Sequence, residues 1–425
     1  MKINEIINLI KNGEYDDKLL DIYVDFAKIE YQRERYKKAL EAFKTCYGDA
    51  DVSVYSAPGR SEIGGNHTDH QHGEVLAASV NSDAIAVVEK IDEPWAYVIS
   101  HGFEQIKVSL GNLEKIDEEE ESTTALIRGV LAKIKENGHV VGGFKAYITS
   151  DVLIGSGLSS SAAFETLLGT IVSGEYNNGE ISAIEIAQIG QFAENVYFGK
   201  PSGLMDQMAC SVGSLVHIDF ADTENPKVES VKLDLDAYGY SLCITDTKGS
   251  HADLTADYAS IPLEMKSVAN LFGREVLGDI SKEFVLENAS KIREKCGDRA
   301  FLRAYHYACE NERVEKEVAA LKSQNLDDFF SLVKKSGNSS YKFLQNVYTS
   351  KDVVHQNLSV ALAVSEAVLG DEGACRVHGG GFAGTIQAFV PNKLVGEYKK
   401  ALDSVFGDNS CVVMKIRKYG GIKVI

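Results

Sequence analysis

The stretch Ile154-Gly155-Ser156-Gly157-Leu158-Ser159-Ser160-Ser161-Ala162-Ala163 decides the fold of this chain. The apolar residues 144–148 before it predict a strand, and the residues from about 158 to 171 predict a helix. Two closely spaced glycines followed by three serines are typical of a helix N-terminus open to a phosphate, because free N–H groups and the helix dipole favour negative charge there. The turn is not a Walker A loop and does not match GxGxxG. By itself it is equally compatible with a glycine turn and a serine N-cap.

A second polar stretch begins where a predicted strand at 52–55 ends, and it reads Ala57-Pro58-Gly59-Arg60-Ser61-Glu62-Ile63-Gly64-Gly65-Asn66-His67-Thr68-Asp69-His70. It gathers Arg, Asn, His and Asp with little apolar material, so we expect a site that recognises a hydroxyl-rich ligand rather than a core strand. A metal site is the alternative, with His67, Asp69, His70 and His72 as possible ligands. We disfavour it, because all four lie in one short stretch and no second ligand group follows at a recognisable spacing.

A third stretch, Glu194-Asn195-Val196-Tyr197-Phe198-Gly199-Lys200-Pro201-Ser202-Gly203-Leu204-Met205-Asp206-Gln207, follows a predicted helix over 184–197. Gly203 permits a tight turn that presents Asp206. Glu194 lies near the C-terminus of the helix, where a carboxylate opposes the helix dipole. A carboxylate placed there suggests a cation, and Mg²⁺ accompanying a nucleotide is the usual one. The alternative is a solvated surface glutamate.

Taken together, these stretches resemble the GHMP small-molecule kinases and, within them, the galactokinase branch. The resemblance runs from about Val52 to the C-terminus and includes a late glycine-rich element preceded by Arg376, namely His378-Gly379-Gly380-Gly381-Phe382-Ala383-Gly384. The serine-rich turn is shared across the superfamily. The matches specific to the galactokinase branch are Arg60 with His67-Thr68-Asp69, then Gly203-Leu204-Met205-Asp206-Gln207, and Ala256-Asp257-Tyr258.

The resemblance implies an α+β fold with two lobes and the active site between them. We expect an N-terminal helical extension over 1–47, an N-terminal lobe with a mixed sheet and helices over 48–230, and a C-terminal lobe with a ferredoxin-like sheet over 231–425. Further strands are predicted at 84–89, 96–99, 215–219, 240–245, 385–390 and 411–417, and further helices at 124–136, 255–272, 299–323, 326–347, 353–367 and 393–406. The extension is either a layer that covers the sheet or a docking or dimer surface.

The resemblance also implies a reaction, in which ATP phosphorylates the anomeric hydroxyl of galactose. Asp206 would orient that hydroxyl and accept its proton, and Arg60 would hold Asp206 ionised. The triphosphate would lie against Gly155, Ser156, Gly157, Leu158, Ser159, Ser160 and Ser161, and Ser161 with Glu194 would complete the Mg²⁺ shell. The sugar would meet Asn66, His67, Thr68, Asp69, Gly203 and Tyr258. The glycines 379–381 would let backbone approach the phosphate turn from the other lobe.

Two departures from the family pattern affect the sugar. The pattern has Gly-Glu before His-Thr-Asp, where this chain has Gly65-Asn66, and it has Val-Asn-Leu-Ile where this chain has Ser61-Glu62-Ile63-Gly64. The family glutamate accepts from a sugar hydroxyl, whereas an asparagine is uncharged and also donates. A kinase for another sugar, such as N-acetylgalactosamine or arabinose, is therefore an alternative. A non-catalytic sugar and ATP sensor is disfavoured, because Ser161-Ala162, Glu194, Asp206 and Arg60 are all present.

The composition excludes several classes of function. The 425 residues carry 44 Lys and Arg against 62 Asp and Glu, a formal charge of −18 that disfavours nucleic acid as a partner. The seven cysteines form no CxxC motif, which fits a reducing compartment. The first residues do not resemble a signal peptide, and no apolar run is long enough to cross a membrane. We therefore expect a cytoplasmic monomer whose partners are its sugar and ATP.

Overall fold

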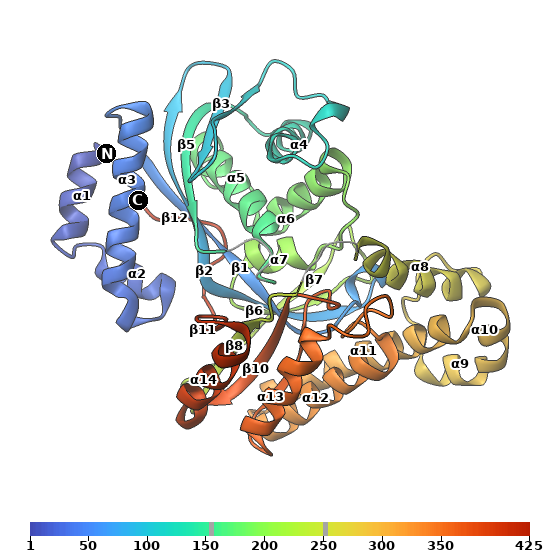
Figure 1. Cartoon of the computed structure of the whole chain (residues 1–425). Coiled ribbons are helices and arrows are strands. Elements are labelled where there is room, and N and C mark those ends of the chain that lie inside the picture. Colours follow the sequence, from blue (N-terminus) through green and yellow to red (C-terminus); the bar gives the residue numbers. More distant parts are fainter. Residues whose placement is uncertain (153–156, 250–253) are drawn as a thin grey trace.

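The computed structural model describes residues 1–152, 157–249 and 254–425, which form two sheets surrounded by helices (Figure 1). Among these residues, eight strands form the larger sheet in the order β12-β1-β2-β5-β3-β4, and β6 and β7 continue it from β2. Neighbouring strands are antiparallel except for β3 and β5, so the sheet is mixed. Its strands are β1 (Ser53–Gly64), β2 (Glu74–Ile91), β3 (Trp95–Ser100), β4 (Ile106–Ser109), β5 (Gly143–Ser150), β6 (Leu215–Asp219), β7 (Lys227–Val231) and β12 (Ile422–Lys423).

One face of this sheet is covered by four helices that lie between β4 and β6 in the chain. Because alternate side chains of a strand point to opposite faces, Tyr55, Ala86 and Val88 lie together on this face. They are buried with Leu167 and Ile171 of the second of these helices. The helices are α4 (Thr123–Glu136), α5 (Ser160–Tyr176), α6 (Ala183–Phe192) and α7 (Met205–Val212).

The opposite face is covered by the N-terminal helices α1 (Ile3–Lys11), α2 (Asp16–Tyr23) and α3 (Ile29–Tyr47), as Figure 1 shows. The intervening strand residues Val54, Ile85 and Val87 point to this side. They form one buried cluster with Ile6, from the apolar stripe of α1, and with Phe43 of α3. The N-terminal segment is therefore a packed layer of the sheet.

The second sheet has the ferredoxin-like arrangement. Its strands β8 (Tyr240–Asp246), β9 (Ala374–His378), β10 (Thr385–Pro391) and β11 (Cys411–Met414) are antiparallel in the order β11-β8-β10-β9. Helices connect the first strand to the second and the third to the fourth, which is the βαββαβ pattern. The predicted α+β fold with a ferredoxin-like unit is confirmed. The helices of this part are α8 (Thr255–Leu271), α9 (Lys282–Glu287), α10 (Ala289–Cys296), α11 (Asp298–Lys322), α12 (Leu326–Ser339), α13 (Asn357–Leu369) and α14 (Val395–Phe406).

The last residues of the chain return to the larger sheet. The Arg417 backbone N–H donates to the Ser79 carbonyl at 2.9 Å, and β12 pairs with β1 through Tyr55 and Lys423. The chain therefore passes between the two sheets twice, from β7 to β8 and from β11 to β12. In the described part of the chain, no helix combines the length and the apolar character that crossing a bilayer requires.

Strand β1 corrects the prediction for the polar stretch that begins at Ala57. We expected the strand to end there, but it continues to Gly64, and residues 54–64 are buried. The polar side chains are tolerated because they have buried partners, so hydrophobic alternation does not mark the strand. The chain bulges between Pro58 and Arg60, where a Cβ atom on Gly59 would lie 2.8 Å from the carbonyl oxygen of Leu158.

Some predicted helices differ from the structure in their boundaries, and two helices were missed. The helix predicted over 326–347 is α-helical only to Ser339 and ends in a π turn, Ser340–Leu344. The helix predicted from 353 begins only at Asn357. Helices α9 and α10 are short and mostly polar, so their weak periodicity gave no signal.

Candidate active site

Arg60 and Asp206 form a bidentate ion pair at the centre of the candidate site. Arg60 follows the bulge in β1, and Asp206 lies in the first turn of α7. Arg60 Nε donates to Asp206 Oδ1 at 2.6 Å and Nη2 donates to Oδ2 at 2.7 Å. The Arg60 side chain is 8% exposed and that of Asp206 is 30% exposed. A carboxylate with both oxygens held in this way has a fixed orientation while its edge stays accessible.

The surroundings of Asp206 keep it ionised at neutral pH. Burial would raise its pKa, but the charge and hydrogen bonds of Arg60, with a hydrogen bond from Ser159, lower the pKa below its ordinary value. Its place at the N-terminus of α7 acts in the same direction, because the positive end of the helix dipole favours an anion. Asp206 is therefore a hydrogen-bond acceptor under physiological conditions.

The end of the glycine-serine turn lies directly beside this pair. The Gly157 carbonyl accepts a hydrogen bond from Arg60 Nη1, and the Arg60 backbone N–H donates to the Leu158 carbonyl at 3.0 Å. Ser159 adopts a left-handed conformation with φ of 57°, and α5 begins at Ser160. The first N–H groups of α5 therefore start next to Asp206. Of the predicted phosphate-binding residues, Gly155 and Ser156 lie outside the described residues.

Glu194 is buried and contacts Ser161. It lies in a π turn, Ala193–Phe198, that follows α6, and is 3% exposed, so it is not a solvated surface residue. Ser161 Oγ donates to Glu194 Oε1 at 3.1 Å, and Lys200 Nζ donates to the same oxygen at 2.8 Å. Gln207 Nε2 donates to Glu194 Oε2 at 2.8 Å. The carboxylate is thus fixed on both oxygens, directly beside the N-terminus of α5.

The donor chemistry of this pair fits magnesium. A serine hydroxyl and one carboxylate are hard oxygen ligands of the kind that Mg²⁺ takes alongside waters and substrate phosphates. Among the described residues, no group of three or more His, Cys, Asp and Glu side chains lies together as a metal site would require. A cation at Ser161 and Glu194 would therefore depend on phosphate oxygens for the rest of its shell, as a nucleotide supplies them.

Asp69 and Gly203 meet close to Asp206. A Cβ atom on Gly203 would overlap the Asp69 carboxylate, so only glycine allows this approach. Burial, reinforced by the negative charge of Asp206, raises the pKa of Asp69 to about 6. The two carboxylates are therefore close enough to interact, and both border the same polar site.

The glycine-rich turn accepts hydrogen bonds from three of the predicted sugar-binding residues. Asn66 Nδ2 donates to the Gly379 carbonyl at 2.8 Å, and Tyr258 Oη donates to the Gly381 carbonyl at 2.9 Å. His67 Nε2 lies 3.1 Å from the Gly380 carbonyl. Since a carbonyl can only accept, Nε2 of His67 carries the proton.

Two residues that flank the glycines, His378 and Thr385, lie beside Gly157 of the phosphate turn. A Cβ atom on Gly157 would lie 3.1 Å from Nδ1 of His378 and would overlap the Thr385 hydroxyl. With φ of +73°, Gly157 is also in the left-handed region. Glycine is therefore required here by both the close approach and the backbone conformation.

Thr68 and His67 are held by the protein rather than left free. Thr68 is fully buried, and its hydroxyl lies 2.8 Å from the Gly65 carbonyl and 2.6 Å from the Glu74 carbonyl. His67 Nδ1 lies 3.3 Å from Nε2 of His70. Burial lowers the pKa of His67, so its ring is neutral. These side chains shape the turn that presents Asp69.

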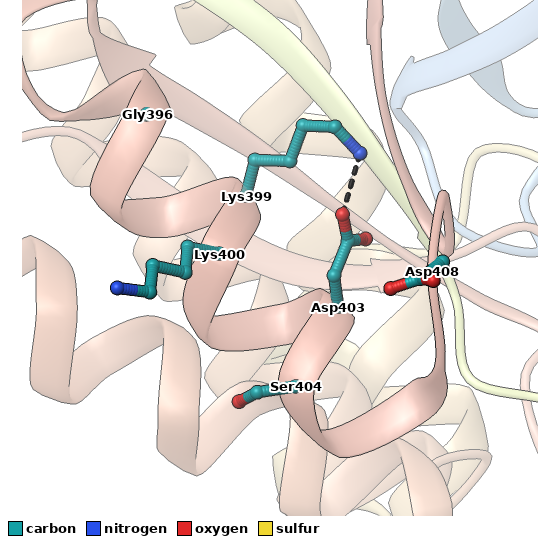
Figure 2. A pocket seen from close by; sticks show the side chains of 6 residues that line it. All are labelled: Gly396, Lys399, Lys400, Asp403, Ser404 and Asp408. Carbon is teal, nitrogen blue, oxygen red and sulfur yellow. Dashed lines mark hydrogen bonds and ion pairs between the residues drawn. The ribbon is translucent and has the colours of Figure 1, made fainter.

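A shallow hollow elsewhere on the surface has no relation to these residues. Figure 2 shows its lining on α14 and the turn that follows, where Lys399 Nζ donates to Asp403 Oδ2 at 2.6 Å. The lining residues are Gly396, Lys399, Lys400, Asp403, Ser404 and Asp408. None of them belongs to the predicted site.

Comparison with known proteins assigns the chain to a family. The family described as "GHMP kinases N terminal domain" matches residues 125–214, and the "Galactokinase galactose-binding signature" matches residues 41–90. A galactokinase of Glaesserella parasuis is 30% identical over 364 residues, which cover 85% of this chain and 91% of that protein. This chain belongs to the galactokinase family. A galactokinase of Streptomyces coelicolor is also 30% identical, over 86% of this chain and 92% of that one.

Solved structures of this superfamily share the fold. The galactokinase of Lactococcus lactis, determined with galactose bound, has a TM-score of 0.78 and 26% identity, and covers 90% of this chain and 98% of that one. A mevalonate kinase has a TM-score of 0.60 at 16% identity, covering 86% of this chain and 99% of that one. The mevalonate kinase structure therefore shares the fold of this chain.

Asn66, where the sequence departs from the galactokinase pattern, faces inward. It is fully buried, and its Nδ2 also donates to Glu62 Oε1 at 3.0 Å. Its Oδ1 accepts from Ser340 Oγ at 3.1 Å and from Asn346 Nδ2 at 2.9 Å. With both amide hydrogens and the oxygen engaged inside the protein, Asn66 joins Glu62 of β1 to the glycine-rich turn and to residues 340 and 346.

The sequence did not single out Lys200, Gln207 or His378 for individual roles. Lys200 stands out only as a helix-ending residue, and Gln207 and His378 only as members of motifs. Gln207 donates to both Glu194 and Glu165, and His378 Nε2 lies 3.1 Å from Ser61 Oγ. A buried glutamine between two carboxylates is visible only once the helices are packed together.

Proposed function

We propose that this protein is a galactokinase that transfers the γ-phosphoryl group of ATP to the anomeric hydroxyl of galactose. The observation that carries the proposal is the Arg60–Asp206 pair beside the N-terminus of α5, in a chain of the galactokinase family. Phosphoryl transfer passes through a loose transition state, so positioning and charge stabilisation supply most of the rate. This site offers a fixed acceptor in Asp206, a fixed cation in Arg60 and the N-terminal N–H groups of α5.

Asp206 acts on the sugar hydroxyl. Its carboxylate accepts a hydrogen bond from the anomeric O–H and takes the proton as the oxygen bonds to phosphorus and the bond from phosphorus to the ADP oxygen breaks. Because its pKa is lowered, Asp206 is ionised before the substrate arrives. Arg60 holds both carboxylate oxygens and offers positive charge beside the transferring group.

Gly157, Leu158, Ser159, Ser160 and Ser161 receive the phosphates of ATP, in line with the backbone N–H groups at the start of α5. Ser161 and Glu194 are the residues that would hold Mg²⁺. When bound, the metal neutralises phosphate charge. Lys200, which donates to the same Glu194 oxygen as Ser161, supplies a second positive charge near the phosphates.

Asp69, with the backbone of Gly203, contacts the sugar hydroxyls. His67 and Tyr258, which contact carbonyl groups of the glycine-rich turn, border the same sugar site. We infer that Asn66 and Thr68 act indirectly, by fixing the turn that carries Asp69. A kinase for a related sugar is the second candidate, because Asn66 faces inward and adds no carboxylate to the sugar side.

A sugar panel tests the proposal. ATP and Mg²⁺ are supplied with galactose, N-acetylgalactosamine, arabinose or glucose, and ADP release is coupled to NADH oxidation. We expect the highest kcat/KM with galactose. A tenfold higher kcat/KM with another sugar would show that galactose is not the preferred substrate, although the reaction would still be sugar phosphorylation. ATP binding without turnover of any sugar would favour a non-catalytic sensor.

A further inference from the structure

The buried carboxylate of Asp83 in β2 connects the N-terminal helices to the larger sheet. Arg35 of α3 donates to Asp83 Oδ1 from Nη1 at 2.5 Å and to the Asp83 carbonyl from Nη2 at 2.7 Å. Arg417 donates to Oδ2 at 3.0 Å, and Tyr23 Oη donates to the same oxygen at 2.8 Å. A fully buried carboxylate needs such partners, so the N-terminal layer supplies part of the charge balance of the sheet.

The same helix reaches Asp151, at the point where β5 ends. Arg35 Nη1 lies 3.3 Å from Asp151 Oδ2, and Tyr31 Oη donates to Asp151 Oδ1 at 2.9 Å. The backbone N–H of Asp151 donates to the Asp83 carbonyl at 2.9 Å, and Ser82 Oγ donates to the Asp151 carbonyl at 2.9 Å. Asp151 is thus fixed through both its side chain and its backbone.

Asp151 lies close, along the chain, to the residues that receive phosphate. It precedes Gly157 in the chain, and a Cβ atom on Gly59, in the β1 bulge, would lie 3.2 Å from Cγ1 of the neighbouring Val152. Asp83 pairs across the sheet with Pro58, two residues before Arg60. The network around α3 therefore reaches Pro58 and Gly59, the two residues that directly precede Arg60 in β1.

We propose that Arg35 and Tyr31 are positioning residues for the nucleotide: by fixing Asp151, they hold Val152 against the β1 bulge at Gly59, which lies beside Leu158 of the phosphate-binding residues. Both residues lie before residue 41, where the match to the galactose-binding signature begins. The N-terminal layer then has a role in ATP binding besides covering the sheet. The inference rests on the proposed function for the identity of the nucleotide.

Three variants of the full-length protein test this role. Tyr31→Phe removes one hydroxyl from Asp151, and Asp151→Asn removes the charge that faces Arg35 while keeping an acceptor for Tyr31. Arg33→Gln is the matched control, because Arg33 also lies on α3 but pairs with Asp16 and Glu30, away from Asp151. Thermal unfolding confirms that each variant is folded. Calorimetric titration with ADP and Mg²⁺ gives Kd, and steady-state kinetics give KM for ATP and for galactose.

We expect Tyr31→Phe and Asp151→Asn to raise the Kd for ADP and the KM for ATP three- to tenfold, with the KM for galactose changed less than twofold. Arg33→Gln should leave all three values within twofold of wild type. The ADP titration needs no sugar turnover, so a failure of the galactokinase assignment would not affect it. An unchanged Kd for ADP in both variants would overturn the proposal, and so would an equal loss in Arg33→Gln.

Discussion

Asn66 Nδ2 donates a hydrogen bond to Glu62 Oε1 at 3.0 Å, so two of the positions at which this chain departs from the family pattern contact each other. The pattern has asparagine and glutamate at these positions, and this chain has glutamate and asparagine. Glu62 also pairs with the buried Arg376 at 2.5 Å. The carboxylate therefore stands four residues earlier in this chain than in the family pattern, in contact with the amide of Asn66.

This contact predicts a compensated exchange. Asn66→Glu alone places a second carboxylate beside Glu62 with no exposure to water and should cost about 3 kcal/mol of unfolding free energy. The double variant Glu62→Asn/Asn66→Glu keeps one carboxylate next to Arg376 and should be more stable than the sum of the single effects by about 2 kcal/mol. Urea unfolding of the four proteins measures this coupling. Additive effects would show that the two positions are independent.

Replacing Arg60 should slow the chemical step and change its pH dependence. Arg60→Gln removes the charge that lowers the pKa of Asp206 and leaves burial to raise it. We expect a loss of about 10²–10³ in kcat, and an acid limb of kcat/KM that moves to higher pH, because Asp206 must be ionised to accept the proton. Single-turnover rates from pH 5 to 9 provide the comparison. An acid limb that stays in place would exclude Asp206 as the titrating group.

Asp69 should make sugar binding dependent on pH. Its pKa is raised to about 6, so lowering the pH through 6 protonates it and should raise the KM for galactose. Asp69→Asn should remove this dependence and raise the KM at pH 8 at least tenfold. KM for galactose and for ATP are measured in parallel from pH 5 to 8. If the KM for galactose of wild type is constant over that range, Asp69 does not act as a carboxylate on the sugar.

Glu317 of α11 should destabilise the protein as the pH rises. It is fully buried, and neither carboxylate oxygen has a hydrogen-bond partner among the described residues. Burial and the charge of Glu310 raise its pKa to about 8, so the folded state holds a proton that the unfolded state releases above about pH 4.5.

The stability contributed by this proton falls as the pH rises from about 4.5 to 8, because the unfolded state binds fewer protons over that range. Glu317→Met should therefore raise the free energy of unfolding at pH 7 by about 2 kcal/mol, and its advantage over wild type should shrink at pH 5. Urea unfolding at both pH values measures the difference. A lower free energy of unfolding for Glu317→Met at pH 7 would contradict the view that the Glu317 carboxyl destabilises the protein there.

Much of the fold could be predicted from the sequence, because the helices and strands around the motifs have clear periodicity. The ferredoxin-like order of β8 to β11 came from the family resemblance, since no local pattern specifies which strands pair. The extension of β1 through Arg60 could not be predicted, because its polar side chains find buried partners from distant parts of the chain. Arg376, for example, is more than 300 residues from Glu62 and becomes its neighbour only in the folded protein.

The sequence predicted which residues of the candidate site lie together, because their chemical types indicate their roles. It did not predict how individual side chains are oriented. Arg60 and Asp206 lie together, and Ser161 lies beside Glu194. The inward orientation of Asn66 depends on four hydrogen bonds, one to Glu62 of β1, one to the glycine-rich turn and two to residues 340 and 346, which no motif encodes. For the same reason, the contact between Arg35 and Asp151 gave no signal in the sequence.

The most direct test of the account compares wild type with Asp206→Asn in the presence of ATP, Mg²⁺ and galactose. Product is followed by phosphorus NMR, and binding of ADP by calorimetry. We expect wild type to form galactose 1-phosphate, and Asp206→Asn to lose about 10³ in kcat or more while its Kd for ADP stays within threefold. Galactose 1-phosphate formed at an undiminished rate by Asp206→Asn, or none formed by wild type, would contradict the account.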